Sequence, residues 1–403
     1  MTRQIARPPE GAQQIIGIIR EWARGITDGQ ELERMRDWID RMDKKKPAEP
    51  LIDIVNWIGL QGNLRELGLK ILDELRGMRL VDIVKIAGRR MALPLALSVA
   101  PKLSGTTIKE NVLGGAEQKF QTMFRSFEGL GSDIALCTFT DLSLIGEPLD
   151  CKIEIPEDAV PMIIEHPIQS REDLKKLYEA DFSEATRYLE NFDTTRMFAE
   201  RFTGLKAGMG VCPFTMAGLL MGAEEVARKT LKDPQLVQEV LEWCVAAIVQ
   251  DAQAQIASGA DLIFVGDPTA GLLSPKAYQT FAADPCRRVV EQIERPVILH
   301  ICGNSTHIIE MMCATGVQGI SIDFMVDLPA IVPRVPNDVV IMGNINPVGT
   351  LLNGTPEEVR RETRELMKKM AGVPNYIGMS GCDIPLPAPI ENVQAMVETM
   401  KEA

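Results

Sequence analysis

The chain has 403 residues, with 45% hydrophobic and 25% charged side chains, as expected for a globular protein with one large α/β domain plus an extension, or with two domains. Its formal net charge of −13 and the lack of a prominent basic patch argue against a nucleic-acid binder. No stretch reads as a signal peptide or an apolar membrane span, so we expect a cytoplasmic protein without a membrane segment.

The first hundred residues have a helical pattern. Ile15, Ile16 and Ile19 lie on one face of a first helix, and further helices follow from residue 52 to 91, broken near Gly59–Gly62 and Gly77. This part has no glycine-rich phosphate motif and no strand alternation. We therefore predict an N-terminal helical extension over residues 1–100, which could cap the following domain, form a homodimer contact or dock a partner protein.

Residues 101–403 alternate between short apolar strands and longer helical patterns, which is typical of parallel strands joined by helical crossovers. The expected strands are 133–138, 205–211, 262–265, 297–299, 319–322, 339–342 and 376–379. One further strand, earlier in the chain or irregular, would bring the number of strands to eight. The pattern predicts a (β/α)₈ TIM barrel, with an open doubly wound sheet as the alternative. No G-x-G-x-x-G motif follows the first strands, which disfavours a dinucleotide site.

Three residues at two strand ends are candidate metal ligands. His300 and Cys302 follow the apolar run Val297–Leu299, and alternate side chains along a strand point the same way. Cys382 ends a second strand of the same design. The eight cysteines lack the spacing of a disulfide framework, which favours reduced thiols and a metal site. Imidazole and thiolates are zinc ligands, so we predict a Zn²⁺ site with an open fourth position.

Other polar residues also follow expected strands. Asp323 could be the fourth metal ligand, or it could bond His300 without contacting the metal. It could also simply cap a helix or lie in a solvated loop. Asp267 is a second candidate catalytic acid. Asn304, Asn344 and Asn346 are expected to line the pocket and orient a small substrate, although turn chemistry alone also favours asparagine and aspartate in loops. In a barrel, all these positions would share the carboxyl-terminal rim, where active sites lie.

Several motifs resemble the uroporphyrinogen decarboxylase superfamily, and within it the methylcobamide:coenzyme M methyltransferase branch, over roughly residues 130–403. They are CPFTMAGLLMG at 212–222, DPTAGLLSPKAYQTF at 267–281, HICGN at 300–304, GNINPVGTLLNGTPEEV at 343–359 and GCDIPLPAPIENVQAM at 381–396. The resemblance implies a (β/α)₈ barrel with zinc held by His300, Cys302 and Cys382. Relatives often carry Glu where Asp323 stands, so direct ligation by the shorter side chain stays open.

The resemblance implies a zinc-dependent methyltransferase that moves a methyl group between a small substrate and the cobalt of a separate corrinoid protein. The substrate would be a thiol acceptor such as coenzyme M, or a methyl donor in an O-demethylation. One alternative is a metal-free decarboxylase or lyase. It is disfavoured because the decarboxylase motif M-R-Q-A-G-R-Y-L-P-E is not continued after residues 86–91. A second alternative is a non-catalytic barrel that binds a corrinoid protein.

Overall fold

The computed structural model describes residues 10–25, 30–44, 46, 48–139, 141–149 and 151–403, so residues 1–9 of the expected extension lie outside it. Its strands are β1 Ala92–Leu93, β2 Ala135–Leu136, β3 Ile153–Glu154, β4 Met162–Ile163, β5 Lys206–Val211, β6 Leu262–Gly266, β7 Val297–Ile301, β8 Gly319–Ile322, β9 Val340–Ile345 and β10 Tyr376–Ser380. All strands expected from the sequence are present, and β3 and β4 form a small antiparallel hairpin beside them.

Eight of the strands form one parallel sheet in the order β1-β10-β9-β8-β7-β6-β5-β2. The backbone N–H of Asp133, just before β2, donates to the carbonyl of Ala92 in β1 at 2.9 Å, which joins the two end strands. The sheet therefore curls into the predicted barrel, and the doubly wound alternative is wrong.

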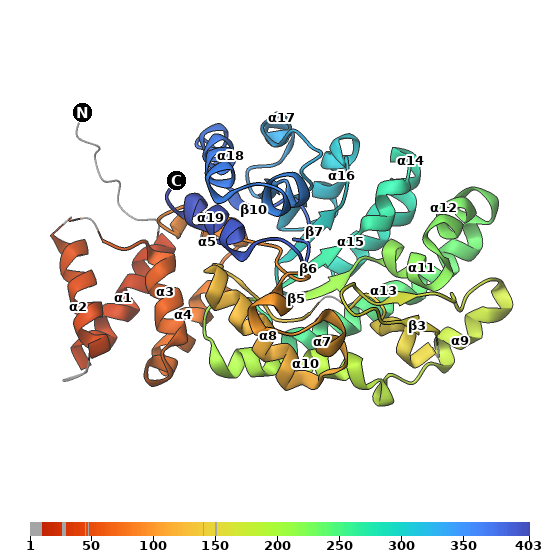
Figure 1. Cartoon of the computed structure of the whole chain (residues 1–403), viewed down its shortest axis with the longest axis horizontal. Helices are drawn as coiled ribbons and strands as arrows, with labels where there is room; N and C mark the ends of the chain where they lie inside the picture. Colours follow the sequence, from red (N-terminus) through yellow and green to blue (C-terminus); the bar gives the residue numbers. More distant parts are fainter. Residues whose placement is uncertain (1–9, 26–29, 45, 47, 140, 150) are drawn as a thin grey trace.

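Helices surround the sheet and extend from one end of it (Figure 1). They are α1 Glu10–Gly25, α2 Gln30–Asp43, α3 Leu51–Leu60, α4 Arg65–Arg76, α5 Leu80–Ile86, α6 Ala100–Ser104, α7 Ile108–Leu113, α8 Gly115–Leu130, α9 Leu174–Glu179, α10 Thr186–Arg201, α11 Pro213–Met221, α12 Ala223–Lys232, α13 Pro234–Ala257, α14 Pro275–Tyr278, α15 Asp284–Val290, α16 Ile309–Ala314, α17 Leu328–Ile331, α18 Pro356–Lys369 and α19 Ile390–Lys401. Among the described residues, no helix has both the length and the apolar character needed to cross a membrane.

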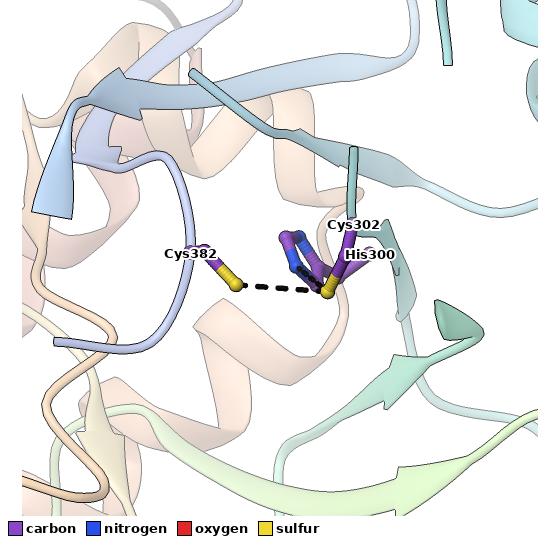
Figure 2. A group of neighbouring side chains, drawn as sticks. All are labelled: His300, Cys302 and Cys382. Carbon is purple, nitrogen blue, oxygen red and sulfur yellow. Dashed lines mark hydrogen bonds between the residues drawn. The ribbon is translucent and has the colours of Figure 1, made fainter. Parts of the chain in front are cut away.

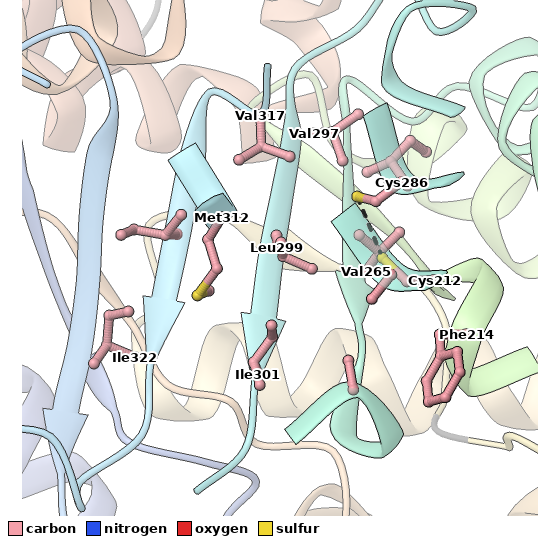
Figure 3. Packing of buried hydrophobic residues seen from close by; sticks show 14 of the residues in the cluster. Cys212, Phe214, Val265, Cys286, Val297, Leu299, Ile301, Met312, Val317 and Ile322 are labelled. Atoms are coloured by element: carbon pink, nitrogen blue, oxygen red, sulfur yellow. Dashed lines mark hydrogen bonds between the residues drawn. The ribbon is translucent and has the colours of Figure 1, made fainter. Parts of the chain in front are cut away.

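The strands are apolar on both faces because each face packs against a core. Val297, Leu299 and Ile301 of β7 lie in the cluster between the sheet and the outer helices, together with Met312 of α16 (Figure 3). Ile298, on the other face of the strand, belongs to the cluster inside the barrel. This alternation turns His300 and Cys302 towards the inside of the barrel.

The N-terminal helices close the amino-terminal end of the barrel. The inner cluster runs without interruption from α3 and α4 to the interior faces of the strands. Polar contacts join the same parts: Arg76 pairs with Asp261 at 2.7 Å, and Gln318 Oε1 accepts from Leu80 N–H at 2.9 Å. Asp261 and Gln318 immediately precede β6 and β8. Of the three roles considered for the extension, the structure shows capping.

Arg89 fastens this cap to the barrel. Its guanidinium contacts Asp133 at 2.8 Å and also pairs with Asp53 of α3, while Lys401 reaches Asp133 from the last helix at 3.1 Å. The Arg89 and Asp133 side chains are only 7% and 1% exposed. Because β1 at Ala92–Leu93 follows directly, we propose that the barrel begins before residue 92, ahead of the boundary expected at residue 100.

Candidate metal centre

The three predicted ligands meet at the carboxyl ends of β7 and β10. His300 Nε2 lies 3.2 Å from Cys302 Sγ, and Cys302 Sγ lies 3.6 Å from Cys382 Sγ. All three donor atoms are within 4.8 Å of one another. Figure 2 shows the Cys382 sulfur pointing across the barrel towards Cys302, with the imidazole of His300 beside it. Folding thus brings together two segments that are eighty residues apart in sequence.

These distances fit a tetrahedral metal ion. Bonds of zinc to sulfur and nitrogen predict ligand–ligand edges of about 3.5 to 3.8 Å, close to the separations that the side chains already have. The donor set of one imidazole and two thiols suits zinc and leaves one position for a substrate atom. The residues therefore fit the expected metal.

The two cysteines share a proton in a way that favours metal binding. The pKa of Cys382 is lowered to about 5, chiefly because the Cys302 thiol donates a hydrogen bond to it, with a further contribution from His300. The same hydrogen bond and burial raise the pKa of Cys302. The lowered pKa of Cys382 favours its thiolate, which is the form that binds a metal.

Ser321 sets the orientation of the imidazole. Its hydroxyl lies 3.0 Å from His300 Nδ1 and 3.6 Å from the sulfur of Met379, and the side chain is fully buried. Because a hydroxyl has one proton, donation to Met379 leaves its oxygen to accept from Nδ1–H. His300 Nε2 then carries the free lone pair that a metal requires.

Ser321 was not identified from the sequence, although a signal was present. It is the one polar residue in the strand Gly319–Ile322, and it pairs with His300 in the register of β7 and β8.

Asp323 bonds the loop that carries the candidate ligand Cys302, and no hydrogen bond joins it to His300 within the described residues. Its Oδ2 accepts from the backbone N–H of Gly303 at 2.9 Å, and its Oδ1 accepts from that of Met325 at 2.9 Å. Gly303 has φ +79°, which a glycine adopts without strain, and it follows Cys302 directly. The carboxylate is therefore used in holding the turn after β7, and the expected contact with His300 is not formed.

Gly381 allows the segment that carries Cys382 to pass close to the loop after β8. A Cβ atom at this position would lie 2.4 Å from the backbone nitrogen of Phe324, in the loop after β8. Only glycine lets the end of β10 pass this loop so closely. The approach brings Cys382 over the mouth of the barrel beside Cys302.

The three asparagines do not lie where they were expected. Asn304 is exposed, and its Oδ1 accepts from the N–H and hydroxyl of Thr306. Asn346 Oδ1 accepts from two backbone N–H groups in the following turn, and Asn344 donates to the carbonyls of Asp323 and Val326. The amides of Asn304 and Asn346 close local turns, and that of Asn344 holds the loop after β8, so none of them lines the cavity beside the candidate metal ligands.

Asp267 lies behind the wall of that cavity. It is 1% exposed, and its Oδ1 accepts from the backbone N–H and the hydroxyl of Thr215, at 3.0 and 2.8 Å. Burial raises its pKa to about 7. Its neighbours Gly266 and Pro268 line the cavity, whereas Asp267 itself ties the end of β6 to the first turn of α11.

A cavity of about 230 Å³ adjoins the metal ligands at the carboxyl ends of the strands. It is bounded by the upper parts of β5 and β6, by α10 and α13, and by the segment after β2, and its wall is mainly apolar. His300, Cys302 and Cys382 form part of this wall. A ligand in the cavity can therefore contact the metal position directly.

Three carboxylates also face this cavity: Asp141, Asp251 and Asp383. Burial raises the pKa of Asp251 to about 6 and that of Asp383 to about 6. Among the described residues, no lysine or arginine lines the cavity. The pocket therefore has a negative electrostatic character, which the sequence motifs did not indicate.

The chain is similar to known proteins over most of its length. The profile of Uroporphyrinogen decarboxylase (URO-D) matches residues 115–403. The chain is 30% identical over 269 residues to the methylcobamide:CoM methyltransferase of Methanosarcina acetivorans, covering 65% of this chain and 77% of that one. It is also 28% identical over 297 residues to the uroporphyrinogen decarboxylase of Prochlorococcus marinus, covering 71% and 84%.

A solved methyltransferase from Methanosarcina mazei superimposes with a TM-score of 0.70 at 21% identity, covering 80% of this chain and 97% of that one. At this identity the similarity concerns the barrel fold. With the match over residues 115–403, the comparisons show that this chain belongs to the uroporphyrinogen decarboxylase family.

Proposed function

We propose that this protein is a zinc-dependent methyltransferase that moves a methyl group between a small substrate and the cobalt of a separate corrinoid protein. The observation that carries the proposal is the convergence of His300 Nε2 and the two sulfurs of Cys302 and Cys382 within 4.8 Å of one another. A methyltransferase among its relatives supports the same activity.

The protein's own residues bind and orient the reactants. His300, Cys302 and Cys382 would hold zinc, which would supply Lewis acidity that lowers the pKa of a substrate thiol. Ser321 keeps the imidazole in the orientation that frees Nε2, and Asp323 holds the loop that carries Cys302. The apolar wall of the cavity excludes water from the nucleophile.

In the transfer to a thiol, the electron pair of the thiolate forms the new S–C bond while the Co–C bond breaks. The cobalt keeps the pair of the broken bond and becomes cobalt(I), and the thiol proton leaves to solvent. The reverse direction takes a methyl group from a donor such as a methyl ether or thioether. Both directions need the cobalt to approach the mouth of the cavity.

An apolar rim supports the approach of a partner protein. The exposed fractions of Leu272, Met325 and Val348 are 60%, 58% and 47%, and these residues follow β6, β8 and β9 respectively. Exposed large apolar side chains gathered at one edge are typical of interaction sites. We propose that the corrinoid protein docks on this rim. A cytoplasmic location stays a prediction from the sequence.

The alternative of a porphyrinogen decarboxylase is less well supported, although a decarboxylase is also among the relatives. A tetra-acidic porphyrinogen needs several cations in its pocket, and none of the described lysines or arginines lines the cavity. A purely binding barrel would have no need for a preformed set of zinc ligands beside an open cavity.

Metal analysis and cobalt spectroscopy test the proposal together. The purified chain should contain about one zinc, as a single catalytic site requires. Cys302→Ser and Cys382→Ser should lose both the zinc and the thiol-dependent change in the methylcobalamin spectrum. Cys313→Ser, in α16 away from the site, is the matched control and should keep both. A chain that retains no zinc, or whose activity survives both substitutions, would contradict the proposal.

A further inference from the structure

The charges that face the cavity are compensated unequally. Asp141 is neutralised by Arg187, whose Nη1 lies 2.6 Å from its carboxylate. Asp383 accepts hydrogen bonds from the backbone N–H groups of Leu97 and Ser98 and from the Ser98 hydroxyl. Within the described part of the chain, no ion pair joins Asp251 to a lysine or arginine. Asp251 is therefore the cavity carboxylate without a cation and without backbone donors.

Asp251 reaches the cavity from α13, outside the barrel wall. Asp251 Oδ2 lies beside Gly210 of β5, where a Cβ atom would be 3.8 Å away, and both residues line the cavity. Its protein partners are neutral: Gln255 Nε2 donates at 2.6 Å, and the Tyr188 hydroxyl is the second hydrogen-bond partner. Asp251 is partly buried, and a carboxylate that is largely removed from water without a cation is uncommon because its desolvation is costly.

Tyr188, whose hydroxyl bonds Asp251, is one of several aromatic side chains that line the same cavity. Tyr188 and Phe182 lie in edge-to-face contact with centroids 5.2 Å apart, and both line the cavity, as does Phe264. A carboxylate beside aromatic faces is a favourable environment for an ammonium group. Thr138 also lines the cavity, although its hydroxyl oxygen is itself buried.

We propose that the substrate is a small aminothiol, or its methyl thioether, which places sulfur at the metal site and its ammonium group against Asp251. This inference rests on the proposed function, since it assumes that the metal site binds sulfur. An anionic thiol, such as a mercaptosulfonate, would instead meet an uncompensated carboxylate of the same sign and no cation. The cavity thus favours a substrate with a positive charge at the end that is remote from its sulfur atom.

Three thiols of equal chain length test the inference: 2-aminoethanethiol, 2-mercaptoethanol and 2-mercaptoethanesulfonate. Their dissociation constants are measured by calorimetry on the zinc-loaded full chain at neutral pH. The ammonium compound should bind most tightly and the sulfonate most weakly. We expect about 10- to 100-fold between the ammonium compound and the neutral alcohol, as for a hydrogen bond between two charged groups.

Asp251→Asn should abolish this preference, so that 2-aminoethanethiol and 2-mercaptoethanol bind about equally. Asp193→Asn, on the exposed face of α10, is the control and should keep the preference. Equal or tighter binding of the sulfonate by the wild-type chain would overturn the inference, as would an unchanged ranking in Asp251→Asn. If none of the thiols binds, or if the chain holds no zinc, the proposed function fails as well. The wild-type ranking decides the question even if a variant fails to fold.

Discussion

Replacing Asp251 should stabilise the folded protein at neutral pH, although we expect the same change to damage substrate selection. The carboxylate is desolvated beside the cavity and has no cationic partner, which raises its pKa from 3.8 to about 6. The carboxyl ionises more easily in the unfolded chain than in the folded protein. Its ionisation therefore lowers the free energy of unfolding. Asparagine keeps the size and one acceptor oxygen without this cost.

The size of the effect follows from the shift of about two pKa units, each worth 1.36 kcal/mol, so that Asp251→Asn should gain up to about 3 kcal/mol. Well below pH 3.8 the carboxyl is protonated in both states, and the two proteins should be equally stable. As pH rises from about 4 to about 6, the unfolded state releases the proton first and the wild type loses stability. Above this window the difference should be constant.

Urea unfolding of the wild type and the variant at several pH values between 4 and 8 measures this difference. Asp193→Asn serves as the control for a lost surface carboxylate and should differ little at any pH. The reasoning about Asp251 would be refuted by a variant that is less stable than the wild type at pH 7, or by a stability difference that does not change between pH 4 and pH 6.

Three further predictions concern the metal, the cap and the partner. Ser321→Ala should weaken zinc binding about tenfold in chelator competition, because His300 loses its orienting partner; unchanged affinity would contradict this role. Arg89→Met should destabilise the fold by about 3 to 5 kcal/mol in urea, since it leaves Asp133 buried without its main partner, and a neutral effect would show the pair to be dispensable. Met325→Asp should weaken binding of the corrinoid protein about tenfold while leaving the reaction with free methylcobalamin unchanged; equal loss of both would place the defect in the active site instead.

Much of the fold could be predicted because its signals are local. Short apolar runs rich in β-branched residues identified the strands, and the spacing of glycines identified the breaks between the helices that form the cap. β1 escaped detection because it has only two residues, Ala92–Leu93, and follows a helical stretch. Its place in the sheet depends on pairing with β10, nearly three hundred residues later, which no local pattern reveals.

Part of the candidate site could also be predicted, because its signals are local in the sequence. His300 and Cys302 follow from the alternation along one strand, and Cys382 follows from a second strand of the same design. The asparagines were expected in the pocket because they follow strands, but strand position does not decide whether an amide faces the pocket or closes its own turn. Asn346, for example, accepts from two N–H groups within three residues of itself.

The sequence by itself determined which residues can form strands and which side chains can bind a metal, since both depend on residue type and on neighbours in the chain. The electrostatics of the cavity were decided only by the tertiary structure. Asp251 lies on a long helix, where it reads as an ordinary solvated acid, and its burial depends on α10, α13 and β5 packing around it. Desolvation depends on these surroundings in space, so the charge that we expect to choose the substrate appears only in the folded protein.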